Sequence, residues 1–141
     1  MHRLFKRKEK DIIYHDRIGS YLIAFYNQQL CLIKTPNGLY LLGGANQDDE
    51  SNLDCIKREA MEETGFEVEI NQFVCSAESY EWMENKGYIH HVQYYYLGKV
   101  IKKIKEQTEQ DHELVFLDAD ACNMKVEMQK WAIEMACSMH K

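Results

Sequence analysis

The chain has 141 residues, 45% of them hydrophobic, and a formal net charge of −6. This length and composition suffice for one domain with a sizeable core, so we expect a single domain over residues 1–141. The negative charge argues against a general nucleic-acid-binding surface, because phosphate affinity needs clustered Lys and Arg. No stretch approaches the roughly 18 apolar residues of a membrane span, and no apolar segment follows the basic N-terminus. We therefore expect neither membrane insertion nor export.

Five cysteines are spread along the chain without a C-x-x-C pair: Cys31, Cys55, Cys75, Cys122 and Cys137. An odd number at such spacings is typical of buried thiols in a reducing compartment. The sequence therefore predicts a cytoplasmic location.

The N-terminal third predicts short strands. Residues 11–14 and 21–26 favour β-structure, and a polar turn joins the second run to residues 30–33 as a hairpin. A tight turn at 35–38 then leads into a strand at 39–42. That strand delivers the chain to Gly43 and Gly44, where the backbone can bend and bring a carbonyl close to a ligand.

Residues 51–64 are predicted to form a helix. Ser51 or Asp49 can cap its start, and Gly65 can end it in a left-handed conformation. At 100° per residue, an apolar stripe lies beside a cluster of carboxylates. The stripe is Leu53, Ile56, Ala60 and Thr64, and the carboxylates are Glu59, Glu62 and Glu63. Since like charges at i,i+4 destabilise a helix, the cluster suggests a divalent cation.

The C-terminal half predicts more strands and one terminal helix. We expect strands at 66–70, 73–80 and 88–100, with residues 81–87 closing a second hairpin. Residues 102–110 read as a mobile or solvent-facing loop, and residues 114–117 as one more strand. Asp118 then opens a short helical turn. A helix with a core-packing stripe follows, formed by Met124, Met128, Trp131, Met135 and Met139.

Nine residues fit the pattern G-x5-E-x7-R-E-U-x-E-E-x-G-U, in which U is apolar: Gly44, Glu50, Arg58, Glu59, Ala60, Glu62, Glu63, Gly65 and Phe66. The segment resembles the complete motif of the MutT/Nudix hydrolases. Two departures are mild: Ala60 is small for an apolar position, and Leu42 stands where many members have Pro. The resemblance implies an α/β fold (α+β), an α/β/α sandwich with a mixed β-sheet between helices.

The resemblance also implies hydrolysis of a diphosphate linkage by water attack on phosphorus, with Mg²⁺ or Mn²⁺ as cofactor and a small nucleotide-type substrate. It implies Glu59 and Glu63 as direct metal ligands and Glu62 as a direct or water-mediated one. A backbone carbonyl near Gly43 or Gly44 would be a further ligand. Arg58 would orient a glutamate of the motif, expected to be Glu50, through a charge-assisted pair.

The general base is left open between several acidic residues. Glu109 and Glu113 are the later candidates for a base or an extra ligand, and the alternative is that they are solvated charges. Asp111 lies between them, and His112 could instead contact phosphate.

Substrate choice is less well specified. Tyr80, Trp82, Tyr94 and Tyr96 could stack on a nucleobase, although aromatic residues in strands more often serve packing. Members of the family's ADP-ribose branch have a Pro shortly after the motif. The only Pro of this sequence, Pro36, precedes the motif, so that feature is missing.

The sequence leaves two alternative functions and the oligomeric state undecided. A Nudix-fold sensor would bind a nucleotide without cleaving it. A diphosphate isomerase would need a catalytic cysteine, for which Cys55 and Cys75 are the candidates. A homodimer is compatible with the family.

Overall fold

The computed structural model describes residues 1–140, without the side chain of His140; the last residue of the expected domain, Lys141, lies outside the described residues. The elements in chain order are β1 (His2–Leu4), β2 (His15–Tyr26), β3 (Gln29–Thr35), β4 (Gly38–Tyr40), β5 (Leu42–Ala45), α1 (Asn52–Thr64), β6 (Phe66–Met83), β7 (Gly87–Lys103), β8 (Glu113–Leu117), a 3₁₀ turn (Ala119–Ala121) and α2 (Glu127–His140).

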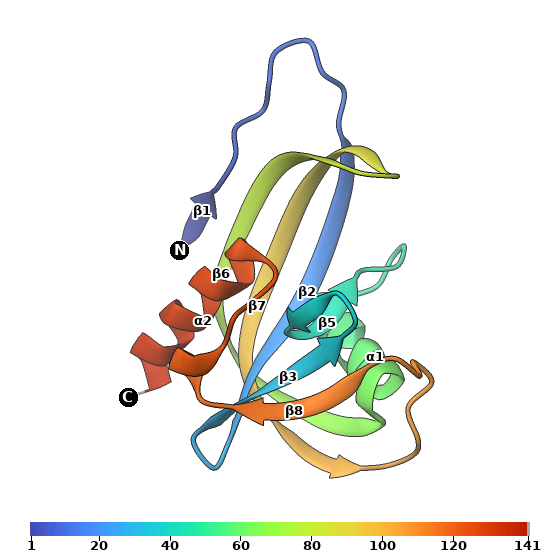
Figure 1. Ribbon diagram of the computed structural model, residues 1–141, viewed down its shortest axis with the longest axis vertical. Coiled ribbons are helices and arrows are strands. Elements are labelled where there is room, and N and C mark those ends of the chain that lie inside the picture. The colour runs from blue at the N-terminus through green and yellow to red at the C-terminus, as the bar shows by residue number, and fades with distance from the viewer. Residues whose placement is uncertain (141) are drawn as a thin grey trace.

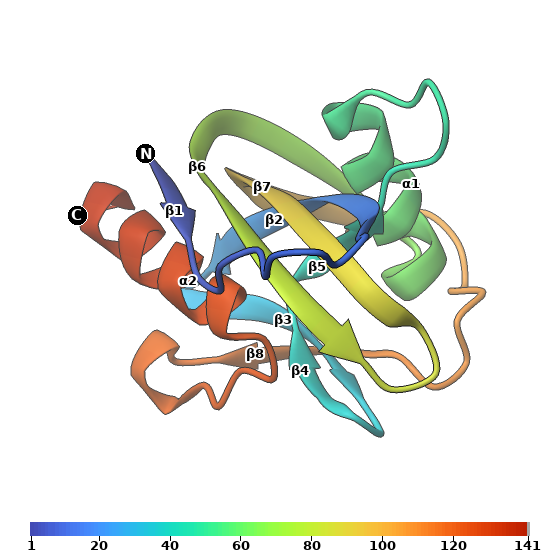
Figure 2. The ribbon, with the colours of Figure 1, turned by 90° about the horizontal axis from the view of Figure 1, so that it is seen from above.

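The strands form a mixed sheet in the order β1-β6-β7-β2-β3-β4, with β5 paired to β2 and β8 paired to β3. The β2–β7 and β1–β6 pairs are parallel, and the other pairs are antiparallel. The long strands β6, β7 and β2 run side by side through the molecule (Figure 1). Seen from above, α1 and α2 lie on opposite sides of the strands (Figure 2). The predicted α/β fold with a mixed sheet between helices is confirmed.

Two hydrophobic clusters hold the helices against the sheet. Tyr21 and Ile23 of β2 pack in the cluster that includes α2, whereas Leu22 and Ala24 pack in the cluster that includes Ile56 of α1. Because successive strand residues point to opposite faces, a strand covered on both sides must be apolar throughout. This explains the continuous apolar runs of β2 and β3.

The helix predicted at 51–64 is confirmed, with one error. The Ser51 hydroxyl accepts a hydrogen bond of 3.1 Å from the Asp54 backbone N–H, and Gly65 adopts φ 77°. Ile56, Ala60 and Thr64 of the expected stripe are buried. Leu53, however, is 41% exposed, and Cys55 is buried in the same turn instead.

The expected strand at 11–14 is wrong, since β2 begins only at His15. Asp11 adopts φ 66°, which interrupts an extended chain, and the ring of Tyr14 packs edge-on against Tyr80 and Tyr88. The two strands expected at 66–70 and 73–80 are instead one strand, β6, which continues through three irregularities in its pairing with β7. The connection expected at 81–87 is correspondingly shorter, because β6 ends at Met83 and β7 begins at Gly87.

The C-terminal helix is confirmed, but its expected start is wrong. Met124 precedes α2 and forms an isolated bridge with Leu39. Met128, Trp131 and Met135 pack in or against the core, as expected, whereas Met139 is 40% exposed. No helix among residues 1–140 is long and apolar enough to cross a membrane.

Candidate active site

The acidic helix α1 lies directly behind the glycine-containing strand β5. Glu63 is buried, and its Oε1 accepts a hydrogen bond of 3.1 Å from the backbone N–H of Gly43. A Cβ built on Gly44 would lie 2.2 Å from Oε2 of Glu59. The absence of a side chain at Gly44 therefore allows the Glu59 carboxylate to approach the strand closely.

Arg58 joins four groups at this point. Its Nε and Nη2 donate to the two oxygens of Glu50 at 2.7 and 3.0 Å, which makes a bidentate ion pair. Its Nη1 donates to Glu59 at 2.6 Å and to Glu62 at 3.1 Å, and its Nη2 also donates to the Ala45 carbonyl. The geometry matches the orienting pair with Glu50 that the sequence predicts for Arg58.

The surroundings shift the acidities of these carboxyl groups in opposite directions. Burial raises the pKa of Glu63 to about 9, and the charges of Glu59, Glu109 and Glu62 add to this effect. Burial also raises the pKa of Glu59. The hydrogen bonds from Arg58, in contrast, lower the pKa of Glu50 to about 2. One guanidinium thus pairs with the three carboxyl groups of Glu50, Glu59 and Glu62, which leaves a negative charge excess that a divalent cation would neutralise.

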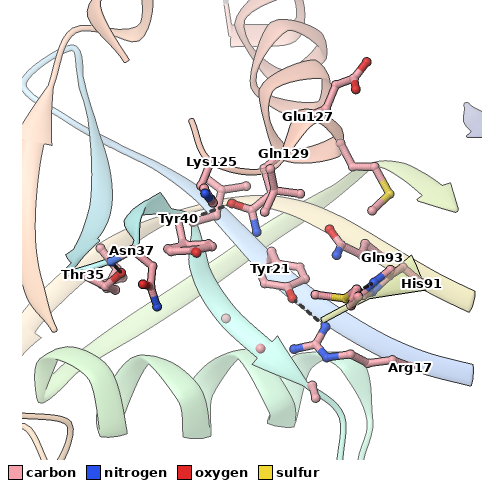
Figure 3. A pocket seen from close by; sticks show the side chains of 18 of the residues that line it. Arg17, Tyr21, Thr35, Asn37, Tyr40, His91, Gln93, Lys125, Glu127 and Gln129 are labelled. Atoms are coloured by element: carbon pink, nitrogen blue, oxygen red, sulfur yellow. Dashed lines mark hydrogen bonds between the residues drawn. The ribbon is translucent and has the colours of Figure 1, made fainter. Parts of the chain in front are cut away.

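Glu59 and Glu63 border a cavity of about 800 Å³. Glu59, Glu63, Gly43 and Gly44 line one part of it. Figure 3 shows its other walls, where Arg17 and Tyr21 of β2 and His91 and Gln93 of β7 face Tyr40, Lys125 and Gln129. Gln129 fixes the opposite wall, because its side-chain oxygen accepts a 2.9 Å hydrogen bond from the Leu41 N–H.

The expected loop at 102–110 is attached to the end of α1. Lys102 and Lys103 belong to β7, and the backbone N–H groups of Thr108 and Glu109 donate to the Glu62 carbonyl at 2.9 and 3.0 Å. The remaining residues are solvent-facing, as expected, apart from the half-buried Gln107. These contacts bring Glu109 close enough for its charge to raise the pKa of both Glu59 and Glu63.

The later acidic candidates differ in position. Asp111 and His112 line the cavity, whereas Glu109 and Glu113 do not. Glu113 begins β8 opposite Lys34. Side-chain ligand atoms of Glu109, Asp111 and His112 lie within 4.8 Å of one another, so these three groups could hold a metal ion.

The four aromatic residues proposed for base stacking do not line the cavity; its aromatic residues are Phe5, Tyr21 and Tyr40. Tyr80 already stacks on His90 with ring centroids 4.1 Å apart, and Tyr96 accepts a hydrogen bond from Asn52. Trp82 is exposed. The side chains of Tyr80, Tyr96 and Trp82 therefore serve packing or face solvent, which is the alternative given for them from the sequence.

The two cysteines considered as nucleophiles are buried and do not line the cavity. Burial raises the pKa of Cys55 and of Cys75 to about 11, so both are thiols at neutral pH. The Cys55 thiol donates to the Gly44 carbonyl at 3.4 Å. This arrangement argues against isomerase chemistry, because that reaction would need a reactive thiolate.

Sequence reasoning missed the polar residues of the other cavity walls: Arg17, Ser79, His91, Gln93 and Gln129. The period-two alternation places Gln93 and His91 on one face of β7, but no motif connects them with Ser79 of β6. Only the strand register brings these side chains together.

Solved structures share this architecture. A MutT NUDIX hydrolase from Burkholderia pseudomallei is 22% identical, with a TM-score of 0.71, over 86% of this chain and 98% of that one. An ADP-ribose pyrophosphatase from Streptococcus suis is 17% identical, with a TM-score of 0.62, over 86% of this chain and 87% of that one. A UDP-X diphosphatase is 16% identical, with a TM-score of 0.71, over 95% of this chain and 68% of that one. The fold is therefore the Nudix fold.

The model of the NUDIX domain matches residues 16–137, whereas no curated protein matches the sequence. The chain belongs to the NUDIX domain family. The resemblance to MutT/Nudix hydrolases is thereby confirmed, and with it the class of enzyme, a pyrophosphohydrolase.

Proposed function

We propose that the protein hydrolyses the diphosphate linkage of a nucleoside diphosphate derivative with the help of Mg²⁺ or Mn²⁺. The observation that carries this proposal is the placement of Glu59 and Glu63, with Gly43 and Gly44, on the wall of a cavity of about 800 Å³. That volume is within the range of pockets that hold small molecules. The similar structures named for ADP-ribose and for UDP derivatives fit the same substrate class.

The residues present fit a hard cation. Carboxylate and carbonyl oxygens are the ligands that Mg²⁺ and Mn²⁺ prefer, and the carboxyl groups here exceed their one Arg partner. Glu59 and Glu63 would hold the ion, with Glu62 and the Gly44 carbonyl as further candidates. When bound, such an ion lowers the pKa of an attacking water and neutralises phosphate charge.

The protein's own residues then orient the reaction. Arg58 fixes the carboxylates of Glu50 and Glu59 relative to each other through hydrogen bonds of 2.6–3.0 Å. We assign Glu109, rather than Glu113, as the candidate general base, because its charge acts on the glutamates of the site. Asp111 and His112 border the cavity and would contact substrate or the outgoing phosphate.

The proposed partner is a small nucleotide-type molecule and no nucleic acid, in keeping with the net charge of −6. Cys31, Cys55 and Cys75 are buried free thiols, in keeping with the proposed reducing environment of the cytoplasm. A homodimer remains part of the proposal, and sedimentation velocity would reveal it.

The test is a panel of nucleoside diphosphate derivatives, including ADP-ribose and UDP-glucose, incubated with Mg²⁺, Mn²⁺ or EDTA. We expect metal-dependent release of two phosphate-bearing products by the wild-type protein and by Glu134→Gln, which alters an exposed glutamate of α2. Glu63→Gln should be inactive. Binding of these compounds without any cleavage would contradict hydrolysis and favour the nucleotide sensor.

A further inference from the structure

Two buried polar groups in the cavity have no hydrogen-bond partner. Ser79 is 1% exposed and His91 is 7% exposed, and both line the cavity. Neither Ser79 Oγ nor His91 Nδ1 has a hydrogen-bond partner. A buried polar atom without a partner is destabilising, so such a pair at a cavity wall points to a ligand that supplies the missing bonds.

The strand register makes the two residues direct neighbours. Ser79 of β6 pairs with His91 of β7, and His91 pairs on its other side with Arg17 of β2. Side chains directly opposite on neighbouring strands are about 5 Å apart. Figure 3 shows His91, Gln93 and Arg17 facing the same space.

The pair offers complementary hydrogen-bonding groups. Nε2 of His91 lies 3.1 Å from the sulfur of Met83. The tautomer that donates Nε2–H to this sulfur leaves Nδ1 as an acceptor, while the Ser79 hydroxyl can donate. Burial lowers the pKa of His91, so the imidazole is neutral at neutral pH. The complement is an uncharged group with a hydrogen-bond donor next to an acceptor.

Gln93 extends this surface. It is 4% exposed, lines the cavity two residues from His91, and its side-chain oxygen accepts a hydrogen bond from the Tyr95 hydroxyl. The amide NH₂ therefore stays available as a donor. We call Ser79, His91 and Gln93 the polar floor.

The polar floor is remote from the glutamates. Gly43 pairs with Tyr21 of β2, whereas His91 pairs with Arg17, four residues further along the same strand. Four residues along and two strands across correspond to roughly 16 Å. One phosphate cannot span that separation, but an extended nucleoside diphosphate can, so the polar floor lies where the organic end of the substrate would be.

We propose that the polar floor binds the hydrogen-bonding edge of the substrate's nucleobase. The proposal rests on the proposed function, because it assumes that the phosphates lie at the glutamates. A pair of sugar hydroxyls offers similar donors and acceptors. The base is the better fit, because Phe5, Tyr21 and Tyr40 line the cavity and aromatic side chains favour a planar ring.

The experiment measures binding in EDTA, so that it does not depend on turnover. Dissociation constants of nucleoside monophosphates and of ribose 5-phosphate, which lacks the base, are compared by calorimetry. In the wild-type protein we expect at least one nucleoside monophosphate to bind more tightly than ribose 5-phosphate. In Ser79→Ala and His91→Phe this advantage should shrink roughly tenfold, as the loss of one good hydrogen bond implies.

The chain provides matched controls on the opposite face of the same strands. Ser76 is a buried serine of β6 that bonds His2, and His90 adjoins His91 but stacks on Tyr80. Ser76→Ala and His90→Phe should keep the base-dependent advantage. Ser79→Ala should also unfold at the same temperature as wild type or higher, because its hydroxyl has no hydrogen bond to lose. A merely structural role would lower that temperature.

Three results would overturn the proposal. They are an unchanged base-dependent advantage in both floor variants, equal binding of ribose 5-phosphate and of every nucleotide, or an equal loss of affinity for both ligand types in the variants. The last result would assign the polar floor to the sugar. Hydrolysis by the wild-type protein is scored separately, so that a failure of the proposed function and a failure of base recognition can be distinguished.

Discussion

The carboxylate of Glu63 accepts a hydrogen bond from the backbone N–H of Gly43 at 3.1 Å while it is almost fully buried. This contact ties the end of α1 to the strand that lines the cavity. It also places an acidic group where its charged form lacks solvent, which raises its pKa to about 9.

Replacing Glu63 by Gln should separate activity from stability. Loss of the proposed ligand should lower turnover by at least the roughly 100-fold that changes of supporting residues cost. The amide oxygen can still accept the Gly43 N–H, and the variant takes up no proton at this site on folding, so metal-free stability at pH 7 should increase by about 3 kcal/mol. Steady-state kinetics and urea unfolding in EDTA measure both effects. Near-normal turnover would remove Glu63 from the ligand set.

The pH dependence of metal-free stability follows from the same group. The pKa of Glu63 in the folded protein, about 9, exceeds its ordinary value of 4.5. Its contribution is therefore fully present below about pH 4.5 and is lost as the pH rises towards 9. The difference in the free energy of unfolding between wild type and Glu63→Gln, measured in EDTA at each pH, isolates this contribution. A difference that is flat between pH 5 and 9 would contradict the assigned pKa.

Gly44→Ala should disturb the site without unfolding the protein. Its Cβ would meet the end of the Glu59 side chain at 2.2 Å, and that flexible side chain can move away. We expect a normal circular dichroism spectrum with weaker Mg²⁺ activation. Gly98→Ala is the matched contrast, because its Cβ would meet the Glu69 backbone oxygen at 2.1 Å. That variant should lose thermal stability, and equal behaviour of the two variants would refute this account.

Arg58→Lys should weaken both the fold and the proposed metal site. Lys keeps the positive charge but cannot make the bidentate pair with Glu50 while also reaching Glu59 and Glu62. Each lost charged hydrogen bond costs about 1.5–3 kcal/mol in partly buried settings, so the melting temperature should fall. The apparent affinity for Mg²⁺ should fall about 10–100-fold. Lys57→Arg, on the same helix, serves as the control that should change neither quantity.

Glu109→Gln and Glu113→Gln test the choice of base. The charge of Glu109 acts on Glu59 and Glu63, whereas Glu113 lies opposite Lys34. Glu109→Gln should reduce kcat by about 10²–10⁴-fold and alter the acidic limb of the pH–rate profile, because a general base acts only in its deprotonated form. Glu113→Gln should behave like wild type. The opposite ranking would transfer the role to Glu113.

Much of the glutamate end could be predicted because its spacing lies within one helix and its flanks. A helical turn places Glu59, Glu62 and Glu63 together, and Ser51 and Gly65 mark its ends by local backbone chemistry. The pairing of Arg58 with Glu50 is implied by the family resemblance of the same short segment, and the structure contains this ion pair.

The other end of the cavity depends on long-range register and could not be predicted. Ser79 meets His91 through the register of the β6–β7 hairpin, which is set by a turn shorter than the connection expected at 81–87. β-Propensity alone also predicted a strand wrongly at residues 11–14. Tyr14 is a loop residue there, and its ring packs against two other rings. Tyr80 likewise looked available for a base, but it already stacks on His90.

The two ends of the cavity come from separate parts of the chain. Residues 42–64 supply the carboxylates, whereas the β6–β7 hairpin supplies Ser79, His91 and Gln93. Exchanging the outer half of that hairpin for the corresponding segment of another family member should thus change the ligand preference to that of the donor protein. The residues proposed for hydrolysis would stay unchanged. Selectivity and catalysis would then be independently evolvable traits of one small scaffold.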